Sequence, residues 1–320
     1  MKISAFWVAA AVILAAGVAA ATVVENEYYF FAGYTILQAI IMAIAWNVLG
    51  GFTGYINFGS AGFFGLGVYT SIALYTAFEP PLVVLIAGAG LMSGLLGLGA
   101  GYLTLRLKGV YFAIATLAMA IVLETLMINW DFVGGATGAY ILTPGSAFFF
   151  ETFIGYLFVV MLVLAIGAAA ISRYLSFSRI GRGFAAIRDE ETAAECTGVP
   201  TLRLKLVSTT VMGALMGVAG APYPFFVTFV EPVSAFNLLI AVNAIAMPMI
   251  GGTATWFGPI VGAILLGSVQ EWTKVTISSE WNLLIVGVML VGFISLAPQG
   301  IVGLVQKLRR KTKADERTAA

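Results

Sequence analysis

The sequence contains no histidine and only one cysteine, Cys196. A single cysteine cannot form a disulfide within the chain, and without histidine neither an imidazole zinc site nor a histidine proton relay can be built. The dipeptide Gly-Lys is also absent, so the chain has no phosphate-binding loop of the form G-x-x-x-x-G-K-[ST]. It contains no H-E-x-x-H or G-x-S-x-G motif, which leaves an intramembrane hydrolase without a metal or a nucleophile.

Charge is scarce as well. Only 10% of the 320 residues are charged and 61% are hydrophobic, against about 25% and about 45–50% in ordinary soluble domains. Uncharged apolar runs recur along the whole chain, and within hydrocarbon each run must satisfy its backbone hydrogen bonds internally. Because the runs are continuous rather than alternating, they predict an all-α, polytopic membrane protein and not a β-barrel.

The apolar runs predict ten membrane-spanning helices. They are expected at 4–24, 28–49, 60–78, 82–104, 110–130, 152–172, 204–228, 235–251, 257–270 and 282–306. The segments 235–251 and 257–270 are short for a hydrocarbon layer of about 30 Å, and if they form one broken or re-entrant element the number falls to eight or nine. A cleaved signal peptide over residues 1–21 is the alternative to a first span, although a basic region of one lysine favours the uncleaved form.

The basic residues indicate the orientation, because Lys and Arg accumulate in short cytoplasmic loops. With the N-terminus in the cytoplasm, 15 of the 16 basic residues fall on the cytoplasmic side, since only Lys274 lies outside it. The sequence therefore predicts one transmembrane domain over 1–306 with a long cytoplasmic loop at 173–203, a basic tail at 307–320, and both termini in the cytoplasm. Five tryptophans fit aromatic belts at the two interfaces; they are Trp46, Trp130, Trp256, Trp272 and Trp281.

Glycine is abundant, with 37 residues. Membrane helices associate through small residues that let backbones approach, so pairs four residues apart predict helix contacts. These pairs are Gly90 and Gly94, Gly97 and Gly101, Gly213 and Gly217, and Gly258 and Gly262. The denser cluster between 50 and 67 also contains polar residues and suits irregular backbone beside a water-filled cavity, with tight packing as the alternative.

Polar residues within the spans are candidates for a translocation pathway. Glu124 is the only carboxylate well inside a span, where a charge is costly, although it lies close enough to the outer interface to reach water instead. Asparagine side chains within spans more often form hydrogen bonds between helices than contact a ligand. The predicted pathway residues are Asn47, Gly54, Asn57, Gly59, Glu124 and Asn243.

The loop from Gly181 to Val199 is polar and rich in helix formers. A short helix near 182–188 would present Phe184 and Ile187 on one face. Asp189 is expected to cap a second short helix, and Gly198 followed by Pro200 is a helix stop. A solvated connection would explain such a loop, but two compact helices also suit a partner's groove.

These motifs resemble the LivM-type permease of the high-affinity branched-chain amino-acid ABC importers. The family's pattern is matched by G-F-T-G-Y-I-N-F-G-S-A-G-F-F-G-L-G at 51–67, R-L-K-G-V-Y-F-A-I-A-T-L-A at 106–118, N-W-D-F-V-G-G-A-T-G at 129–138, and I-G-G-T-A-T-W-F-G-P-I-V-G-A at 250–263. The loop pattern G-R-x-x-x-A-I-R-D-x-E-x-A-A-E-x-x-G is present at 181–198. One departure is Ala254, where relatives often have Gly.

The resemblance implies a ten-helix fold of the vitamin B12 importer type (type II ABC importer) in a prokaryotic plasma (inner) membrane. It implies a homologous second permease, two cytoplasmic ATP-binding subunits that carry the ATP and Mg, and an extracytoplasmic substrate-binding protein. The chain itself would bind no cofactor and no nucleic acid, and would catalyse no reaction. The loop would couple it to the ATPase through Arg182, Phe184, Ile187, Arg188, Asp189, Glu191, Glu195 and Gly198. Of these, Arg182, Arg188, Asp189 and Glu195 would make charged contacts with the ATPase, and Phe184 and Ile187 would be apolar anchors.

The resemblance implies branched-chain or related amino acids as substrate, with urea, short amides or aromatic acids as alternatives within the same architecture. Two other classes remain open on the residues alone. An ion-coupled secondary transporter would need titratable groups at mid-membrane, for which Glu124 is thin support, and a non-transporting scaffold would show no uptake with all its partners present.

Overall fold

The computed structural model describes residues 3–104, 107, 109–142, 150, 152–276, 284–285, 287–289, 291–292 and 300–304. Helices dominate this part of the chain. The long helices are α1 (Ile3–Val23), α2 (Tyr28–Thr53), α3 (Ser60–Phe78), α4 (Leu82–Thr104), α5 (Val110–Ile128), α6 (Phe153–Phe177), α9 (Thr201–Gly220), α12 (Leu238–Gly251) and α13 (Gly258–Thr276). The short elements are η1 (Asp131–Val133), η2 (Gly135–Thr137), α7 (Arg179–Asp189), α8 (Glu191–Cys196), α10 (Tyr223–Val227), α11 (Pro232–Ala235), and the paired strands β1 (Ala139–Tyr140) and β2 (Phe229–Val230).

Eight helical segments of the described chain are long and apolar enough to cross a membrane. They correspond in order to the first eight predicted spans, and the bounds at 60–78 and 82–104 agree with α3 and α4. The ninth predicted span, 257–270, lies within α13 except for its first residue, and α13, which carries Glu271 and Lys274, is not among the eight. The tenth, at 282–306, falls largely outside the described residues, as does the predicted tail at 307–320.

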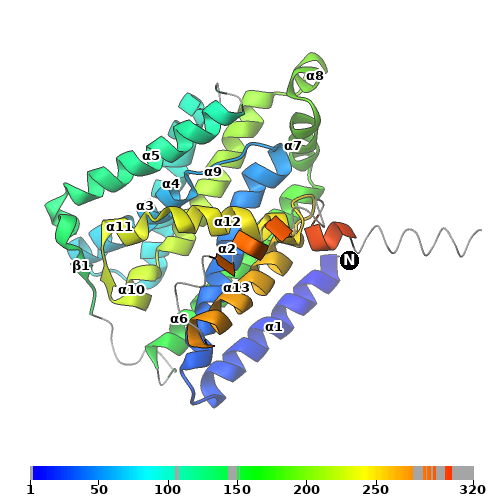
Figure 1. Ribbon diagram of the computed structural model, residues 1–320. Coiled ribbons are helices and arrows are strands. Elements are labelled where there is room, and N and C mark those ends of the chain that lie inside the picture. The colour runs from blue at the N-terminus through cyan, green and yellow to red at the C-terminus, as the bar shows by residue number, and fades with distance from the viewer. Residues whose placement is uncertain are drawn as a thin grey trace, which may run out of the picture.

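The two short predicted spans are separate helices. The first is split at Phe236 and Asn237 into α11 and α12, and the Asn237 side chain accepts a hydrogen bond from the backbone N–H of Leu239 at 2.8 Å, which caps α12. At about 1.5 Å per residue, the 14 residues of α12 extend about 21 Å, and Figure 1 shows α12 lying across the other helices. α13 packs against α12 through the predicted glycine pair at 258 and 262.

The α2 helix forms the centre of the bundle. It packs against α6, α9, α12 and α13, and most of its residues are buried, whereas most of the residues of α1 are exposed. Trp46 lies in this core with 2% of its surface exposed, and its indole N–H donates to the Asn57 carbonyl at 2.9 Å. The prediction that Trp46 belongs to an interfacial belt is therefore wrong.

The predicted glycine pairs bring α4 and α9 together. A Cβ on Gly97 would lie 2.5 Å from the Thr209 carbonyl oxygen, and one on Gly217 would lie 2.5 Å from the Ala89 carbonyl oxygen. Side chains cannot be accommodated at such distances, so the absence of a Cβ on each helix permits the two backbones to touch. Small residues at this interface are confirmed as packing residues.

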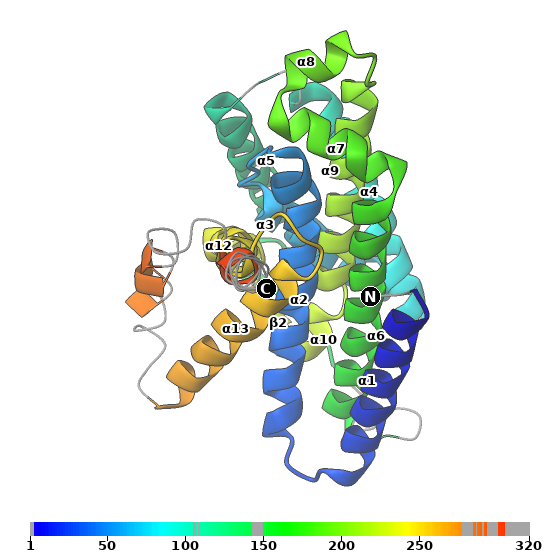
Figure 2. The ribbon, with the colours of Figure 1, turned by 90° about the vertical axis from the view of Figure 1, so that its right-hand side faces the viewer.

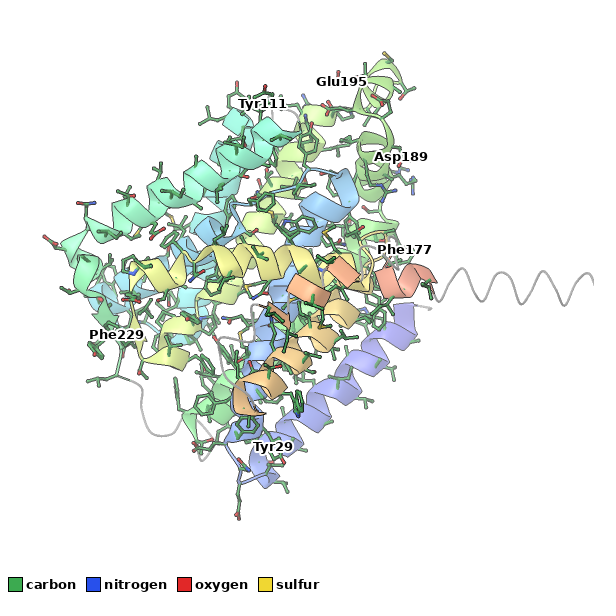
Figure 3. The ribbon with its side chains drawn as sticks, viewed as in Figure 1. Tyr29, Tyr111, Phe177, Asp189, Glu195 and Phe229 are labelled. Atoms are coloured by element: carbon green, nitrogen blue, oxygen red, sulfur yellow. The ribbon has the colours of Figure 1, made fainter. Side chains whose placement is uncertain are left out.

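The connections between helices gather at two ends of the bundle. α7 and α8 protrude at one end, beside the C-terminus of α2 and the N-terminus of α5, and the strand pair lies at the other end (Figures 1 and 2). Asp189, Glu195 and Tyr111 lie toward the first end, whereas Tyr29 and Phe229 lie away from it (Figure 3). This placement agrees with the alternation of loops that the basic residues predicted, and which side of the membrane the α7–α8 end faces stays a prediction.

Candidate functional site

Capping residues and an extended residue between the helices set the bounds of α7 and α8. The Ser178 hydroxyl accepts a hydrogen bond from the Gly181 backbone N–H at 3.1 Å and thereby satisfies a free donor at the start of α7. α7 ends at Asp189, and Glu190 precedes α8 without a side-chain cap. The prediction that Asp189 caps the second helix is wrong, because Asp189 is the last residue of α7. Gly198 has φ +83°, a left-handed conformation that ends the segment as predicted.

The predicted apolar face of α7 exists, and it is turned toward the bundle. Phe184 is 0% and Ile187 is 4% exposed. Phe184 clusters with Val48 and Phe52 of α2 and with Leu175 of α6. The prediction that Phe184 and Ile187 anchor an ATPase is therefore wrong, since both side chains are already buried within their own chain and instead hold α7 on the spans.

The charged residues of α7 and α8 form two groups, one directed outward and one directed into the bundle. Arg182 is exposed, and the side chains of Arg188 and Asp189 are 37% and 73% exposed, with their charged atoms 3.4 Å apart. At such exposure this contact contributes little to stability. Glu195 is exposed as a residue, and one of its carboxylate oxygens accepts from the Thr201 hydroxyl at 2.6 Å. The first three present their charge outward from the α7–α8 end of the bundle.

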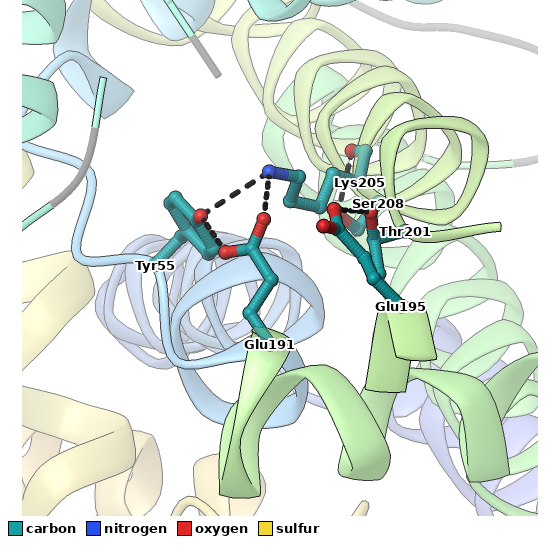
Figure 4. A network of polar contacts seen from close by, with 6 residues as sticks. All are labelled: Tyr55, Glu191, Glu195, Thr201, Lys205 and Ser208. Atoms are coloured by element: carbon teal, nitrogen blue, oxygen red, sulfur yellow. Dashed lines mark hydrogen bonds and ion pairs between the residues drawn. The ribbon is translucent and has the colours of Figure 1, made fainter. Parts of the chain in front are cut away.

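Glu191 belongs to the second group, which is directed inward (Figure 4). Its carboxylate accepts from the Lys205 ammonium at 2.7 Å and, at its second oxygen, from the Tyr55 hydroxyl. The same ammonium lies 3.2 Å from the Tyr55 hydroxyl oxygen and 4.9 Å from the centre of its ring. The side chains of Lys205 and Glu191 are only 5% and 14% exposed. We call Tyr55, Glu191 and Lys205 the buried triad.

The environment fixes the protonation of Tyr55. Burial first, and then the hydrogen bond to the Glu191 carboxylate, raise the pKa of Tyr55 well above its ordinary value. The phenol therefore keeps its proton and donates to Glu191 throughout the physiological range. The arrangement is one cation, one anion and one neutral donor, so the buried charge sums to zero and each charge has a partner.

The segment 54–59, which connects α2 to α3, packs against the same end. Gly54, with φ +80°, ends α2, and a Cβ there would lie 3.3 Å from the Cγ of Arg188. The Asn57 side chain accepts from the Gly59 backbone N–H at 2.6 Å. A Cβ on Gly59 would lie 2.4 Å from the Thr116 carbonyl oxygen of α5. Three predicted pathway residues thus lie close together in packed backbone next to α7 and α8.

The other three predicted pathway residues lie on three different helices. Asn47 of α2 is fully buried, and neither atom of its amide has a hydrogen-bond partner in the described part of the chain. Glu124 is half-buried on α5. Asn243 of α12 accepts from the Gln270 side chain of α13 at 3.1 Å. No described hydrogen bond joins these three to one another, and their role in a pathway stays a prediction.

Tyr55 and Lys205 were missed as site residues. Lys205 does carry a signal in the sequence, because it is the second residue of the predicted span 204–228, and a lysine in such a place needs a partner or a route to water. The partner could not be named, since Tyr55 is 150 residues away in sequence.

Comparison with known proteins identifies the family. Residues 28–294 match the family described as "Branched-chain amino acid transport system / permease component". The chain belongs to this permease family. It is 27% identical over 292 residues to the high-affinity branched-chain amino acid transport system permease protein LivM of Escherichia coli, covering 83% of this chain and 68% of the relative. The Salmonella typhimurium LivM is 26% identical over the same share of both chains.

A second relative from Escherichia coli is the permease protein LivH, 23% identical over 145 residues, which are 45% of this permease and 46% of LivH. No solved structure matches the chain significantly. The expected likeness to the vitamin B12 importer therefore stays a prediction, whereas the polytopic, all-α architecture and the permease family are established.

Proposed function

We propose that this permease is the membrane-spanning subunit of an ATP-driven importer of branched-chain or related amino acids, and that α7 and α8 dock a cytoplasmic ATPase. The docking proposal rests on the way α7 and α8 direct their apolar and their charged side chains to different sides. Phe184, Ile187 and Ala194 are buried against the bundle. Arg182, Arg188 and Asp189 present charge outward. A rigid, charged protrusion of this kind suits register-specific contact with a partner.

The energy source is proposed to lie on other chains. The sequence has no phosphate-binding loop, so ATP and Mg would be held by two partner ATPase subunits. The purified chain, free of ATPase contamination, should neither hydrolyse ATP nor transport, and measurable turnover by the subunit alone would contradict this.

The remaining partners follow from the family. The chain is similar to both LivM and LivH of one organism, which supports pairing with a homologous second permease. An extracytoplasmic binding protein would deliver substrate in the prokaryotic plasma membrane, with the α7–α8 end in the cytoplasm. The permease family argues against the ion-coupled secondary transporter.

The substrate proposal rests on the relatives' names, which refer to branched-chain amino acids. Urea, short amides and aromatic acids are the alternatives. Uptake into vesicles should be measured with the complete complex and its own binding protein. Competition of labelled leucine by unlabelled isoleucine and valine is expected, and competition only by an amide or an aromatic acid would replace this substrate assignment.

Docking is tested at Arg188, whose charged end is partly exposed while its Cγ packs near Gly54. Arg188→Glu keeps a Cγ and reverses the charge, and Arg188→Lys is the matched control that keeps the charge. The reversed variant should release the ATPase in a pull-down and lower ATP-driven uptake at least tenfold, whereas the control should retain most of both. Normal ATPase retention together with normal uptake in Arg188→Glu would mean that α7 and α8 are only a solvated connection.

A further inference from the structure

The α8 helix is held on the molecule mainly by polar contacts. It has six residues, which is too few for a helix to be stable alone, and Ala194 is its only buried residue. Glu190, which joins it to α7, is extended. Two carboxylates of α8 accept hydrogen bonds from other elements: Glu191 accepts from the Tyr55 hydroxyl and the Lys205 ammonium, and Glu195 accepts from the Thr201 hydroxyl.

The Glu191 carboxylate joins two elements that are distant in sequence. One oxygen contacts Lys205 of α9, and the other contacts Tyr55 of the 54–59 segment. Figure 4 shows the three side chains converging between these elements. The Lys205 side chain is only 5% exposed, so separating α8 from α9 would part a buried charge from its ion-pair partner. Separating α8 from the 54–59 segment would break the hydrogen bond that the Tyr55 hydroxyl donates to Glu191.

The 54–59 segment is in turn tied to two spans. The Asn57 carbonyl accepts from the Trp46 indole of α2, and the Phe58 backbone N–H donates to the Thr116 hydroxyl of α5 at 3.2 Å. The Tyr55 ring also meets Phe112 of α5 edge to face, with 5.2 Å between ring centres. A displacement of α8 therefore has a continuous route of hydrogen bonds and ring contacts into α2, α5 and α9.

We propose that the buried triad is the mechanical link that makes α8 and the 54–59 segment move as one unit, so that a force applied at α8 is delivered to α2, α5 and α9. This inference rests on the proposed docking of an ATPase at α7 and α8. Glu191, Lys205 and Tyr55 are positioning residues, because they act through the helices that they join. The Glu191 side chain points into the permease and not toward the ATPase. Its role would therefore be to pass the movement of α8 on to Tyr55 and Lys205, and not to bind the ATPase.

The decisive variant is Glu191→Gln combined with Lys205→Met. It removes both charges together, so neither is left buried alone, and the side chains keep nearly the same size. Tyr55→Phe removes only the hydroxyl and serves as a second, milder variant. The matched control is Glu271→Gln with Lys274→Met, which neutralises a pair of the same 2.7 Å length on α13, where the lysine side chain is 42% exposed.

The readout is the amount of amino acid transported per ATP hydrolysed by the reconstituted complex, together with ATPase retention in a pull-down. The double variant at the triad should lower this ratio at least tenfold, Tyr55→Phe should lower it less, and the control pair should leave it unchanged. The swap Glu191→Lys with Lys205→Glu should recover part of the ratio, which a general loss of stability would not produce.

The outcomes distinguish a failure of the mechanical link from a failure of the proposed transport function. If the unaltered complex shows no ATP-driven uptake, or the ATPase does not bind the unaltered permease, the proposed function fails. If the unaltered complex transports, and both the double variant and Tyr55→Phe transport as many molecules per ATP as it does, the link is refuted while the function stands. If the double variant does not fold, a normal ratio in Tyr55→Phe and no recovery in the charge swap refute the link.

Discussion

The contact between α4 and α9 yields a quantitative prediction, because two glycines of α4 differ only in what surrounds them. A Cβ on Gly97 would lie 2.5 Å from the Thr209 carbonyl oxygen and 3.1 Å from the Cα of Thr210. A Cβ on Gly99 would have nothing within 4 Å. Gly97→Ala and Gly99→Ala therefore make the same chemical change in the same helix, one against a backbone and one in open space.

The expected energies follow from two opposing effects. Replacing glycine by alanine within a helix favours the helix by about 1 kcal/mol, and this gain is common to both variants. Overpacking a filled interior costs about 1–3 kcal/mol. The atoms that oppose the new Cβ at Gly97 are main-chain atoms, which move only if the helices separate, so the upper part of that range is expected.

The assay is unfolding of the purified permease in mixed micelles of increasing SDS content, followed by far-ultraviolet circular dichroism. Gly99→Ala should be as stable as the unaltered chain or more stable by about 1 kcal/mol. Gly97→Ala should be less stable than Gly99→Ala by about 2–3 kcal/mol. Equal unfolding midpoints for the two variants would refute direct backbone contact between α4 and α9 at this position.

Three further predictions concern α7, the residue Gly198 that follows α8, and α3. Phe184→Ala should destabilise the isolated subunit by about 3–5 kcal/mol, because Phe184 is fully buried in its own chain. An effect seen only with the ATPase present would mean that Phe184 anchors the ATPase after all. Gly198→Val should cost about 1–2 kcal/mol through its positive φ alone, and Gly198→Asn, which tolerates that conformation, should cost less in the same SDS unfolding assay. Gly62→Leu should reduce complex yield or uptake, because a Cβ there would lie 3.0 Å from the Cα of Ala120 on α5, whereas Gly167→Leu, which has open space, should behave as the unaltered chain.

The sequence was sufficient wherever a local pattern decides the structure. Hydrophobic runs placed α3 and α4 to the residue. Glycine pairs four residues apart predicted close helix contacts, because only small residues allow such an approach, and the structure shows that α4 and α9 are the helices that meet there. The helix over 182–188 was also predicted, and Phe184 and Ile187 do share a face.

The wrong anchoring role and the missed triad depend on what lies opposite a residue, and the wrong cap depends on where a helix begins. Periodicity shows that Phe184 and Ile187 share a face, but an inward face and a docking face have the same period. The Asp189 cap failed because Ser178, also a good capping residue, begins the helix in which Asp189 is the last residue. The buried triad depends on an approach between Tyr55 and Lys205 that one sequence cannot reveal.

The single thiol of the chain lies on the proposed docking surface. Cys196, the last residue of α8, is exposed, and the sequence has no other cysteine. A fluorophore or a spin label would therefore attach at one known place without any background mutation. Its mobility and accessibility would report directly, in the unaltered chain, when an ATPase covers α8 and when ATP binding displaces that helix.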